Sequence, residues 1–580
     1  MTKTLVRTVV LAVAALALGL TGCAAPVDVR AGEQARFDAV RHDEFLDLIT
    51  ADSLTLHWFL RDPAGLGIDA PETRLLTVDA PADEDVARVR ARIAEFATID
   101  RALLTPDQQD DYDVLAYRMA LFEPALEYHY HGSGLLGAEK LHVMTPLMLS
   151  EYRFDDREAI DRYLVLLAQV GDVFDSLIRL QDDRAARGLY LTDAQLALVI
   201  DECHGFVSGD NVLLASFAER LAGTDLPEPA RQAYLALNAA LYADVVVPAY
   251  GRLVAALERL RDSGATTAEV VVSEATRAAY AHDLARLGIS RPAAEVLAIA
   301  DRQVPALVDA ITALIEAAGE DPRAAYRFDG PTTAPDLFDY WAGHAAADFP
   351  ALPQDIAVEV GPIPDSLNAF SIAYYLVPRL DDQDTHQIRY DADYAEQFPG
   401  HFAQTMAHEG IPGHLLQKTW LRSGPWSSYR QVVPVDAYVE GWAQYAETYA
   451  YRYLADDDTV TRLHQLDATL NQMVLLRLDL GLHYEGWSHQ AAVDYVAAAV
   501  PVWGDTAAFA GDFVDYIAVS PLQVVPYAMG QYEIEALRDR YQAQRGASYT
   551  DRQFHEDLLN LGPAPFSLLE RWMDRALPER

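Results

Sequence analysis

The sequence predicts a mainly helical fold of two lobes with one small β-sheet. Across residues 37–315, apolar residues recur at intervals of three and four, as in helices that bury one face; one such set is Val247, Tyr250, Leu253, Leu257 and Leu260. Between residues 356 and 390 the pattern changes to short strand-like runs, and after residue 402 the helical spacing returns. A chain of 580 residues is long enough for one large helical enzyme with two lobes.

The first residues have the features of an export signal. Lys3 and Arg7 form a basic start, and residues 9–20 are apolar but fewer than a typical membrane span contains. The tetrapeptide LTGC follows at residues 20–23. It resembles the lipobox of bacterial lipoproteins, in which cleavage precedes a cysteine that carries lipid.

These features predict a membrane-anchored lipoprotein on the periplasmic or extracellular face. We expect a signal peptide over residues 1–22, lipid on Cys23 and a tether over residues 23–35, so that the N-terminal lipid is the only contact with the membrane. The alternative is an ordinary signal peptide that contains a cysteine. Cys203 is the only other cysteine, so we expect no intrachain disulfide and predict that Cys203 is a small buried apolar residue.

Two lobes are predicted after the tether. Residues 36–350 form a helical lobe, in which proline and glycine separate the apolar runs. Residues 351–580 form a lobe that holds the sheet and the functional motifs. Its strands are predicted at residues 356–360, where apolar and polar residues alternate, in the apolar and aromatic run 369–377, and at residues 387–390.

The charge of the chain excludes some classes of function. The formal net charge is -42, from 45 basic and 87 acidic residues. Nucleic-acid binding is not expected, because a phosphate-binding surface needs a basic footprint. Attraction to anionic lipid is excluded for the same reason.

The most informative motif is MAHEGIPGHLLQ at residues 406–417. A histidine and a glutamate are adjacent at His408 and Glu409, and a second histidine, His414, lies six residues after the first. Imidazole and carboxylate groups are the ligands of hydrolytic zinc sites. In a regular helix, however, a spacing of six places the two imidazoles about 120° away from a common face. One straight helix therefore cannot direct both histidines to one ion.

A break in the helix would restore the convergence. Pro412 removes a helical hydrogen bond and clashes with the carbonyl of His408, four residues earlier. Gly413 tolerates unusual backbone angles. We therefore expect a helix through His408, a break at residues 411–413 and a second helix from His414. The alternative is a helix–turn–helix corner with two solvated histidines.

A second motif, DAYVEGWAQYAE at residues 436–447, supplies carboxylates. Glu440 and Glu447 are seven residues apart and so share one helix face, among apolar and aromatic neighbours. A carboxylate there is unfavourable without a partner, and a metal ion would relieve that penalty. The alternative is a pair of surface carboxylates on an amphipathic helix.

The two motifs together predict a catalytic site for one zinc ion. His408, His414 and Glu440 provide three protein ligands and leave the fourth position for water. Glu409, next to a ligand, is the predicted general base, and it would then pass the proton to the leaving amine.

Four ordered segments resemble the bacterial domain-of-unknown-function 885 family, which is grouped with the gluzincin-like metallopeptidases. They are residues 408–417 (HEGIPGHLLQ), 440–447 (EGWAQYAE), 478–487 (LDLGLHYEGW) and 526–538 (PYAMGQYEIEALR). The resemblance implies a gluzincin-like fold, with the third ligand on the helix after the histidine-bearing one and a small sheet beside the active-site helix. Two departures are present: Leu415 stands where the family often has a second histidine, and residues 384–387 (DTHQ) replace an Arg-Pro-Gly element.

The resemblance also suggests further site residues. His483 and Tyr527 are candidate donors to the oxyanion. Arg538 is a candidate for binding a substrate carboxylate, because a guanidinium pairs with it through two hydrogen bonds. An edge strand of the sheet would bind the substrate backbone, and we assign this role to the strand with Tyr374. The alternatives are a helix-capping His483, a core Tyr527, an Arg538 paired with a nearby glutamate, and a purely structural strand.

The predicted function is a zinc-dependent peptidase that hydrolyses small peptides in the cell envelope. One alternative is a metal-dependent amidase that acts on non-peptide or cell-wall amides, because the same ligands can serve several amide substrates. Another is a catalytically silent peptide-binding lipoprotein, which an intact Glu409 disfavours.

Overall fold

The computed structural model describes residues 28–576 except 69–71, 138–139, 209–210, 325–327, 329, 364–371, 384, 455–456 and 505–508. The fold is mainly helical with two small sheets, which confirms the predicted class at this level. The signal peptide predicted at 1–22, the lipid site Cys23 and the first part of the predicted tether lie outside the described residues.

The first half of the chain is a succession of helices. Several begin at a side-chain cap: Thr105 and Thr192, for example, each form a capping box with the glutamine three residues later. The helices are α2 (Val29–Ile49), α3 (Ser53–Phe59), α4 (Asp83–Phe96), α5 (Pro106–Met119), α6 (Phe122–Tyr128), α7 (Leu141–Ser150), α8 (Arg157–Ala168), α9 (Val170–Ala186), α10 (Asp193–Val207), α11 (Val212–Ala222), α12 (Glu228–Leu241), η4 (Tyr242–Val246), α13 (Val247–Asp262), α14 (Glu274–Arg286), α15 (Ala293–Ala318) and α16 (Ala334–Ala345).

The larger sheet has three strands in the order β3-β5-β4. They are β3 (Ala357–Pro362), β4 (Ala373–Leu376) and β5 (Thr385–Tyr390); β5 runs parallel to β3 and antiparallel to β4. All three lie within or close to the predicted strands. A second sheet, β1 (Leu191–Thr192) with β2 (Thr266–Thr267), was not predicted, because two residues a strand are too few to form a pattern.

The rest of the chain returns to helices. A π-helical turn, η8 (Leu480–Glu485), continues α22. The helices are α17 (Ala392–Gln397), α18 (Pro399–Glu409), α19 (His414–Ser423), α20 (Ser428–Val432), α21 (Asp436–Ala450), α22 (Asp458–Asp479), α23 (His489–Ala499), α24 (Ala510–Val519), α25 (Val525–Arg545), α26 (Asp551–Leu559) and α27 (Phe566–Ala576). Short helical turns are η1 (Pro63–Leu66), η2 (Arg101–Leu103), η5 (Pro322–Ala324), η7 (Tyr451–Tyr453), η9 (Pro501–Trp503) and η11 (Gly546–Ser548).

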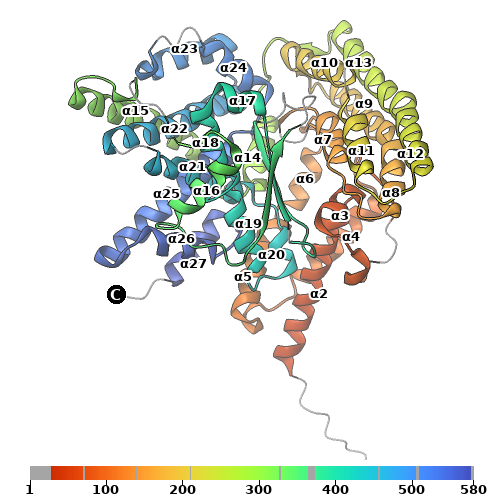
Figure 1. Cartoon of the computed structure of the whole chain (residues 1–580), viewed down its shortest axis with the longest axis horizontal. Helices are drawn as coiled ribbons and strands as arrows, with labels where there is room; N and C mark the ends of the chain where they lie inside the picture. Colours follow the sequence, from red (N-terminus) through yellow and green to blue (C-terminus); the bar gives the residue numbers. More distant parts are fainter. Residues whose placement is uncertain are drawn as a thin grey trace, which may run out of the picture.

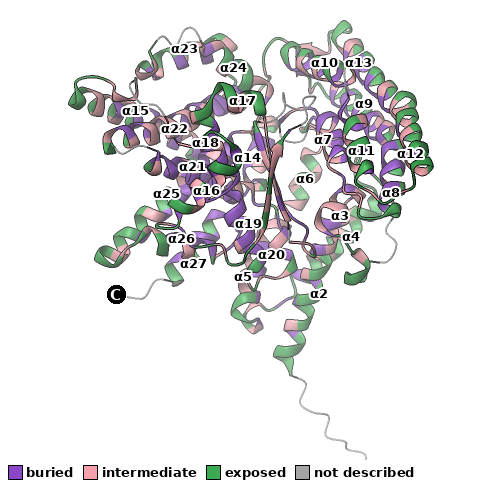
Figure 2. Ribbon diagram, in the orientation of Figure 1, coloured by how far each residue is buried: buried purple, intermediate pink, exposed green. Residues whose placement is uncertain are grey.

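The three-stranded sheet stands between two groups of helices (Figure 1). Helices α7 to α13 lie on one side, and α15, α22 and α25 lie on the other. Two hydrophobic cores correspond to this arrangement, and Figure 2 shows their buried residues on the inner faces of the helices. Helices α2, α5 and α14 to α16 contribute to the larger core together with α18 to α27. The boundary at residue 350 between the two lobes stays a prediction.

One helical stretch in the described chain is long and apolar enough to span a membrane. It is residues 228–262, which comprise α12, η4 and α13 and contain an 18-residue window with a mean hydropathy of 1.4. Tyr250, Leu253 and Leu257, on its α13 part, are buried in the smaller core. Core helices of soluble proteins pass the same test, so this stretch is weak evidence for a span.

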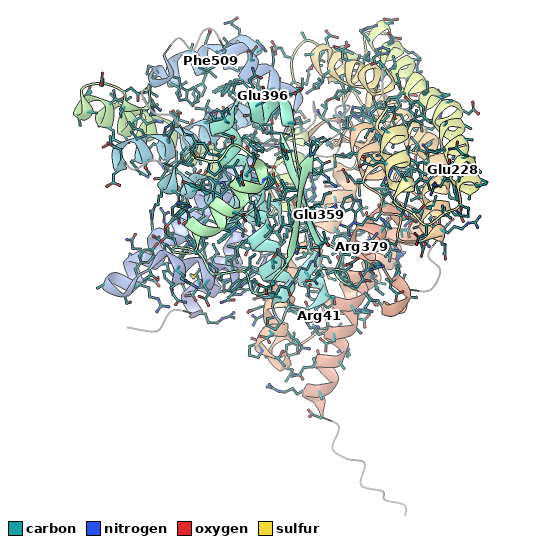
Figure 3. All side chains as sticks on the ribbon, in the orientation of Figure 1. Arg41, Glu228, Glu359, Arg379, Glu396 and Phe509 are labelled. Atoms are coloured by element: carbon teal, nitrogen blue, oxygen red, sulfur yellow. The ribbon has the colours of Figure 1, made fainter. Side chains whose placement is uncertain are left out.

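A buried ion pair connects the sheet to the N-terminal helices. The guanidinium of Arg379, just after β4, lies 2.6 Å from the carboxylate of Asp155 and donates a hydrogen bond of 2.9 Å to the carbonyl of His57 in α3. Arg379 is 1% exposed. Figure 3 shows it near one end of the sheet. The position of β4 is therefore tied to helices far away in the sequence.

Helices α21 and α25 cross at two glycines. A Cβ atom on Gly530 would lie 2.0 Å from the carbonyl oxygen of Ala437, and one on Gly441 would lie 2.4 Å from the Cα of Gly530. No side chain fits at such distances, so the two backbones touch. This crossing brings the segment with Glu440 next to the one with Tyr527.

We predict that Gly530→Ala destabilises the protein by about 1–3 kcal/mol or more, because the added methyl group must push α21 and α25 apart. The measurement is the free energy of unfolding in denaturant. The matched control is Gly251→Ala in α13, where an added Cβ meets nothing within 4 Å. That control should be neutral or stabilising by about 0.5–1 kcal/mol. Equal stability of the two variants would contradict a tight crossing.

Candidate metal centre

A sharp turn separates the two histidine-bearing helices. Helix α18 ends at Glu409, and α19 begins at His414. The peptide bond before Pro412 is cis. A Cβ atom on Gly413 would lie 1.8 Å from the carbonyl oxygen of His408, so only glycine fits there. The predicted helix break at residues 411–413 is confirmed.

Helix α21 holds this turn from the side. The indole Nε1 of Trp442 donates to the carbonyl oxygens of Pro412 and Gly413, at 3.0 and 3.3 Å. The side-chain amide of Gln417 in α19 donates to the carbonyl of Tyr438, at 3.3 Å. No local pattern in the sequence predicts these contacts, because they depend on how the helices pack. They fix the turn relative to the helix that carries Glu440.

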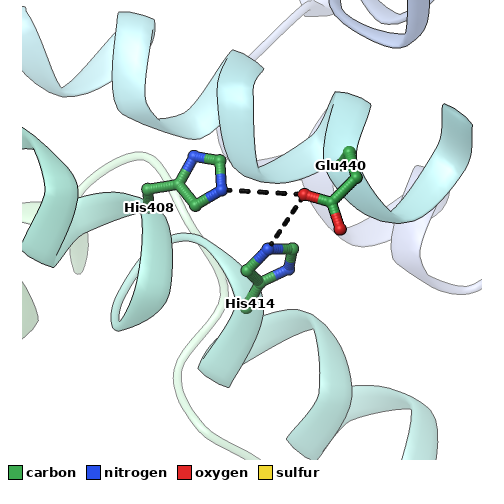
Figure 4. A group of neighbouring side chains, drawn as sticks. All are labelled: His408, His414 and Glu440. Carbon is green, nitrogen blue, oxygen red and sulfur yellow. Dashed lines mark ion pairs between the residues drawn. The ribbon is translucent and has the colours of Figure 1, made fainter. Parts of the chain in front are cut away.

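The turn brings the three predicted ligands together (Figure 4). The Nε2 atom of His414 lies 3.4 Å from Oε2 of Glu440, and that of His408 lies 3.8 Å from the same oxygen. The three potential ligand atoms all lie within 4.8 Å of one another. Zinc binds nitrogen and oxygen at about 2.0–2.2 Å, so two ligand atoms of a tetrahedral ion lie roughly 3.3 Å apart. The donor set and its spacing fit one zinc ion.

Burial and neighbouring charges have opposite effects on the pKa values of His408 and Glu440. His408 and His414 are each 8% exposed. Burial lowers the pKa of His408, but the neighbouring carboxylates of Glu440 and Glu447 outweigh it and raise that pKa to about 10. Burial raises the pKa of Glu440, but the two histidines outweigh it and hold that pKa well below its usual range. The cluster thus favours a positive charge beside the carboxylate, which a divalent cation can also supply.

A second carboxylate orients the first histidine. Oε2 of Glu447 lies 3.0 Å from Nδ1 of His408. The other ring nitrogen of His408 therefore faces Glu440. A histidine ligand whose second nitrogen bonds a carboxylate is typical of zinc proteins. The sequence placed Glu447 on the same helix face as Glu440 without assigning it this role.

Glu409 lies beside the three ligands, and its carboxylate is not engaged by a hydrogen bond from another described residue. It is the last residue of α18 and is 8% exposed. Among the described residues its carboxylate accepts no hydrogen bond, and its charge acts on both His408 and Tyr527. Its lone pairs are therefore available to a water molecule.

Tyr527 also faces the cluster. Its ring stacks on that of His408, with centroids 6.1 Å apart and an angle of 20°. Its hydroxyl interacts with the carboxylate of Glu440. Burial, Glu440 and Glu409 all raise the pKa of Tyr527, so its hydroxyl keeps its proton and remains a donor.

His483 is engaged elsewhere. It lies in η8, and its Nε2 is 2.9 Å from the carbonyl oxygen of Ile517, so that nitrogen donates to α24. Of the two predicted oxyanion donors, the described structure places Tyr527 at the ligands and ties His483 to the backbone of α24.

Arg538 and Tyr374 have partners away from the three ligands. Arg538 is eleven residues after Tyr527 on α25, a distance of about 16 Å along the helix. Its guanidinium donates to the hydroxyl of Tyr445 at 3.3 Å and lies over the Tyr445 ring. The hydroxyl of Tyr374, in edge strand β4, donates to Glu151 at 3.1 Å. Their substrate roles stay predictions.

The family of the chain follows from a match over most of its length. The profile of the family "Bacterial protein of unknown function (DUF885)" matches residues 64–573. The chain belongs to this family. All four DUF885-like segments noted in the sequence lie within the matched residues. No curated protein matches this DUF885 chain in sequence.

Two solved structures resemble this DUF885 protein. One is "the putative lipoprotein from Colwellia psychrerythraea", with a TM-score of 0.78 and 20% identity, covering 94% of this chain and 99% of that one. The other is "a putative lipoprotein of unknown function from Shewanella oneidensis", with a TM-score of 0.59 and 15% identity, covering 93% of this chain and 99% of that one. At these identities the likeness establishes the fold alone.

We predict that Glu447→Ala weakens zinc binding by about 10- to 100-fold, because His408 loses the carboxylate that orients its ring. The measurement is the zinc dissociation constant from competition with a chelator. The control is Glu396→Ala, an exposed glutamate of α17 labelled in Figure 3. Equal zinc affinity in the Glu447 variant and the control would show that the carboxylate does not support the site.

Proposed function

We propose that this DUF885 protein is a zinc-dependent peptidase that hydrolyses small peptides in the cell envelope. The observation that carries the proposal is the convergence of His408, His414 and Glu440 within 4.8 Å. Glu409 lies directly beside this cluster. Two successive helices with one histidine ligand each, a later helix with the glutamate and a small sheet before them also support a two-lobed gluzincin-like fold.

Each catalytic role has a residue in place. Bound zinc would supply Lewis acidity at the scissile carbonyl and make water a stronger acid. Glu409 takes the proton from the attacking water and passes it to the leaving amine. Tyr527 donates a hydrogen bond to the oxygen on which negative charge develops. Glu447 keeps His408 in the required orientation.

The edge of the sheet offers a place for the substrate backbone. Strand β4 is at one end of the order β3-β5-β4, so it has a neighbour in this sheet on one side only. An extended peptide can pair with such an edge through main-chain hydrogen bonds. We propose that Tyr374 and its neighbours on β4 bind the substrate in this way.

The same proposal includes a lipid anchor at Cys23. The LTGC sequence at residues 20–23 supports it, and each of the two similar structures is named a "putative lipoprotein". The active site would then face the periplasm or the exterior, with the membrane reached through the lipid. The test is mass spectrometry of the mature protein. Detection of Cys23 without lipid would rule the anchor out.

We predict that Glu409→Gln keeps its zinc and its fold but loses at least about 10²–10⁴-fold in kcat, because glutamine cannot accept the proton from water. The measurement is single-turnover cleavage of a peptide library by zinc-loaded protein, with zinc content determined on the same sample. Binding of the peptides should change little, because the loss lies in the transition state.

Tyr527→Phe provides the matched comparison. It removes one hydrogen-bond donor and leaves the general base in place. The activation free energy for kcat should therefore rise by about 3 kcal/mol while zinc stays bound. If Glu409→Gln still cleaves peptides at the wild-type rate, the peptidase mechanism is wrong. The cluster would then be a structural site in a peptide-binding lipoprotein.

A further inference from the structure

A cavity of about 350 Å³ is lined by parts of α19 and α21, the helices that carry His414 and Glu440. Its walls come from the end of β4, from α19 and from the start of α21. Gln417 and Lys418 on its wall are the first residues of α19 to reach it, so it begins about one helical turn beyond His414. Its size is at the lower end of the range of small-molecule sites, which suits one end of a peptide.

Two cations, Lys418 and Arg422, line this cavity, and among the described residues neither forms an ion pair with a carboxylate within 4 Å. Lys418 has no hydrogen bond or ion pair with any described residue. Arg422, which is 9% exposed, contacts the backbone carbonyl and side-chain oxygen of Gln431 through Nη1, at 3.1 and 3.3 Å. Its Nε is buried without a partner. Lys418 and Arg422 are four residues apart on α19, so they share one face of the helix.

The other buried arginines of the described chain have compensating partners. Arg379 pairs with Asp155, and Arg477 lies 2.6 Å from Asp301. Arg184, which lacks a carboxylate, donates to three backbone carbonyls instead. A buried charge without such compensation is unfavourable.

Lys418 is half-buried and Arg422 is buried, so both charges are less well solvated than exposed ones. Burial lowers the pKa of Lys418 to about 8 and that of Arg422 to about 10. Asp436, on the cavity wall, and Glu440 attract Lys418 but form no ion pair with it within 4 Å. Arg422 repels it. An anion that enters the cavity would therefore meet two cations that have few competing partners.

We propose that this cavity binds a carboxylate group of the substrate through Lys418 and Arg422. The inference rests on the proposed peptidase function and specifies its substrate class. Along α19, Lys418 and Arg422 lie about 6 and 12 Å beyond His414. An extended peptide advances about 3.4 Å per residue, so the carboxylate lies roughly two to four residues from the scissile bond. It belongs either to the C-terminus of a short peptide or to an acidic side chain.

Three probe peptides separate these sources: Ala-Ala-Ala as the free acid, its C-terminal amide, and Ala-Ala-Glu as the C-terminal amide. Their binding to the full-length protein is measured by calorimetry, with the metal-free wild type and with zinc-loaded Glu409→Gln, neither of which should turn them over. The free acid should bind roughly 10- to 100-fold more tightly than the neutral amide, as charge-assisted hydrogen bonds predict. Tight binding of the glutamate peptide would identify the site as one for acidic side chains.

Substitutions of the two cations test whether the preference for a carboxylate arises in this cavity. Lys418→Met and Arg422→Met should each remove most of the preference for a carboxylate, and Lys418→Arg should retain it. The control is Arg88→Met, which removes an arginine that pairs with Asp85 on the surface of α4. Circular dichroism establishes that each variant is folded.

The outcomes are distinct from those of the peptidase test. If neither carboxylate peptide binds more tightly than the neutral amide, or if the preference survives both methionine variants, the inference is wrong even where Glu409-dependent cleavage is present. If the preference depends on Lys418 and Arg422 but no peptide is cleaved, the carboxylate site stands and the peptidase function fails.

Discussion

The metal centre depends on the turn between α18 and α19. Because His408 and His414 are six residues apart, no regular helix can direct both at one ion. The close approach of Gly413 to the carbonyl of His408 makes the chain double back. The indole of Trp442 then bonds both carbonyls that the turn exposes. The geometry of the ligands is thus a consequence of backbone contacts that only glycine permits and that α21 secures.

Helix α21 connects the turn to the rest of the site. It supplies Glu440 and Glu447 from one face and Trp442 from another, so the third ligand, the orienting carboxylate and the support of the turn all belong to one helix. The contact between Gly441 and Gly530 presses α25 against this helix and places Tyr527 over the ligands. The fold positions the chemistry through two close backbone contacts, one at the turn and one at the helix crossing.

Local patterns predicted much of this arrangement. Proline and glycine between the histidines predicted the break, and the carboxylates spaced by seven predicted a shared helix face. The distances between residues of different motifs depend on three-dimensional packing, which local patterns do not predict. Arg538 and Tyr527 are in one DUF885-like segment of the sequence, residues 526–538, yet a straight helix separates them by about 16 Å. The cavity around Lys418 and Arg422 combines α19 with β4, and no local pattern in the sequence joins those segments.

The central claim is that His408, His414 and Glu440 hold one zinc ion. Equilibrium dialysis of the purified protein against zinc, followed by elemental analysis, tests it most directly. The wild type should retain about one equivalent, as a site with three protein ligands does, and His414→Ala should lose most of it while remaining folded. A wild type that retains no zinc, or a His414→Ala variant that retains a full equivalent, would contradict the account.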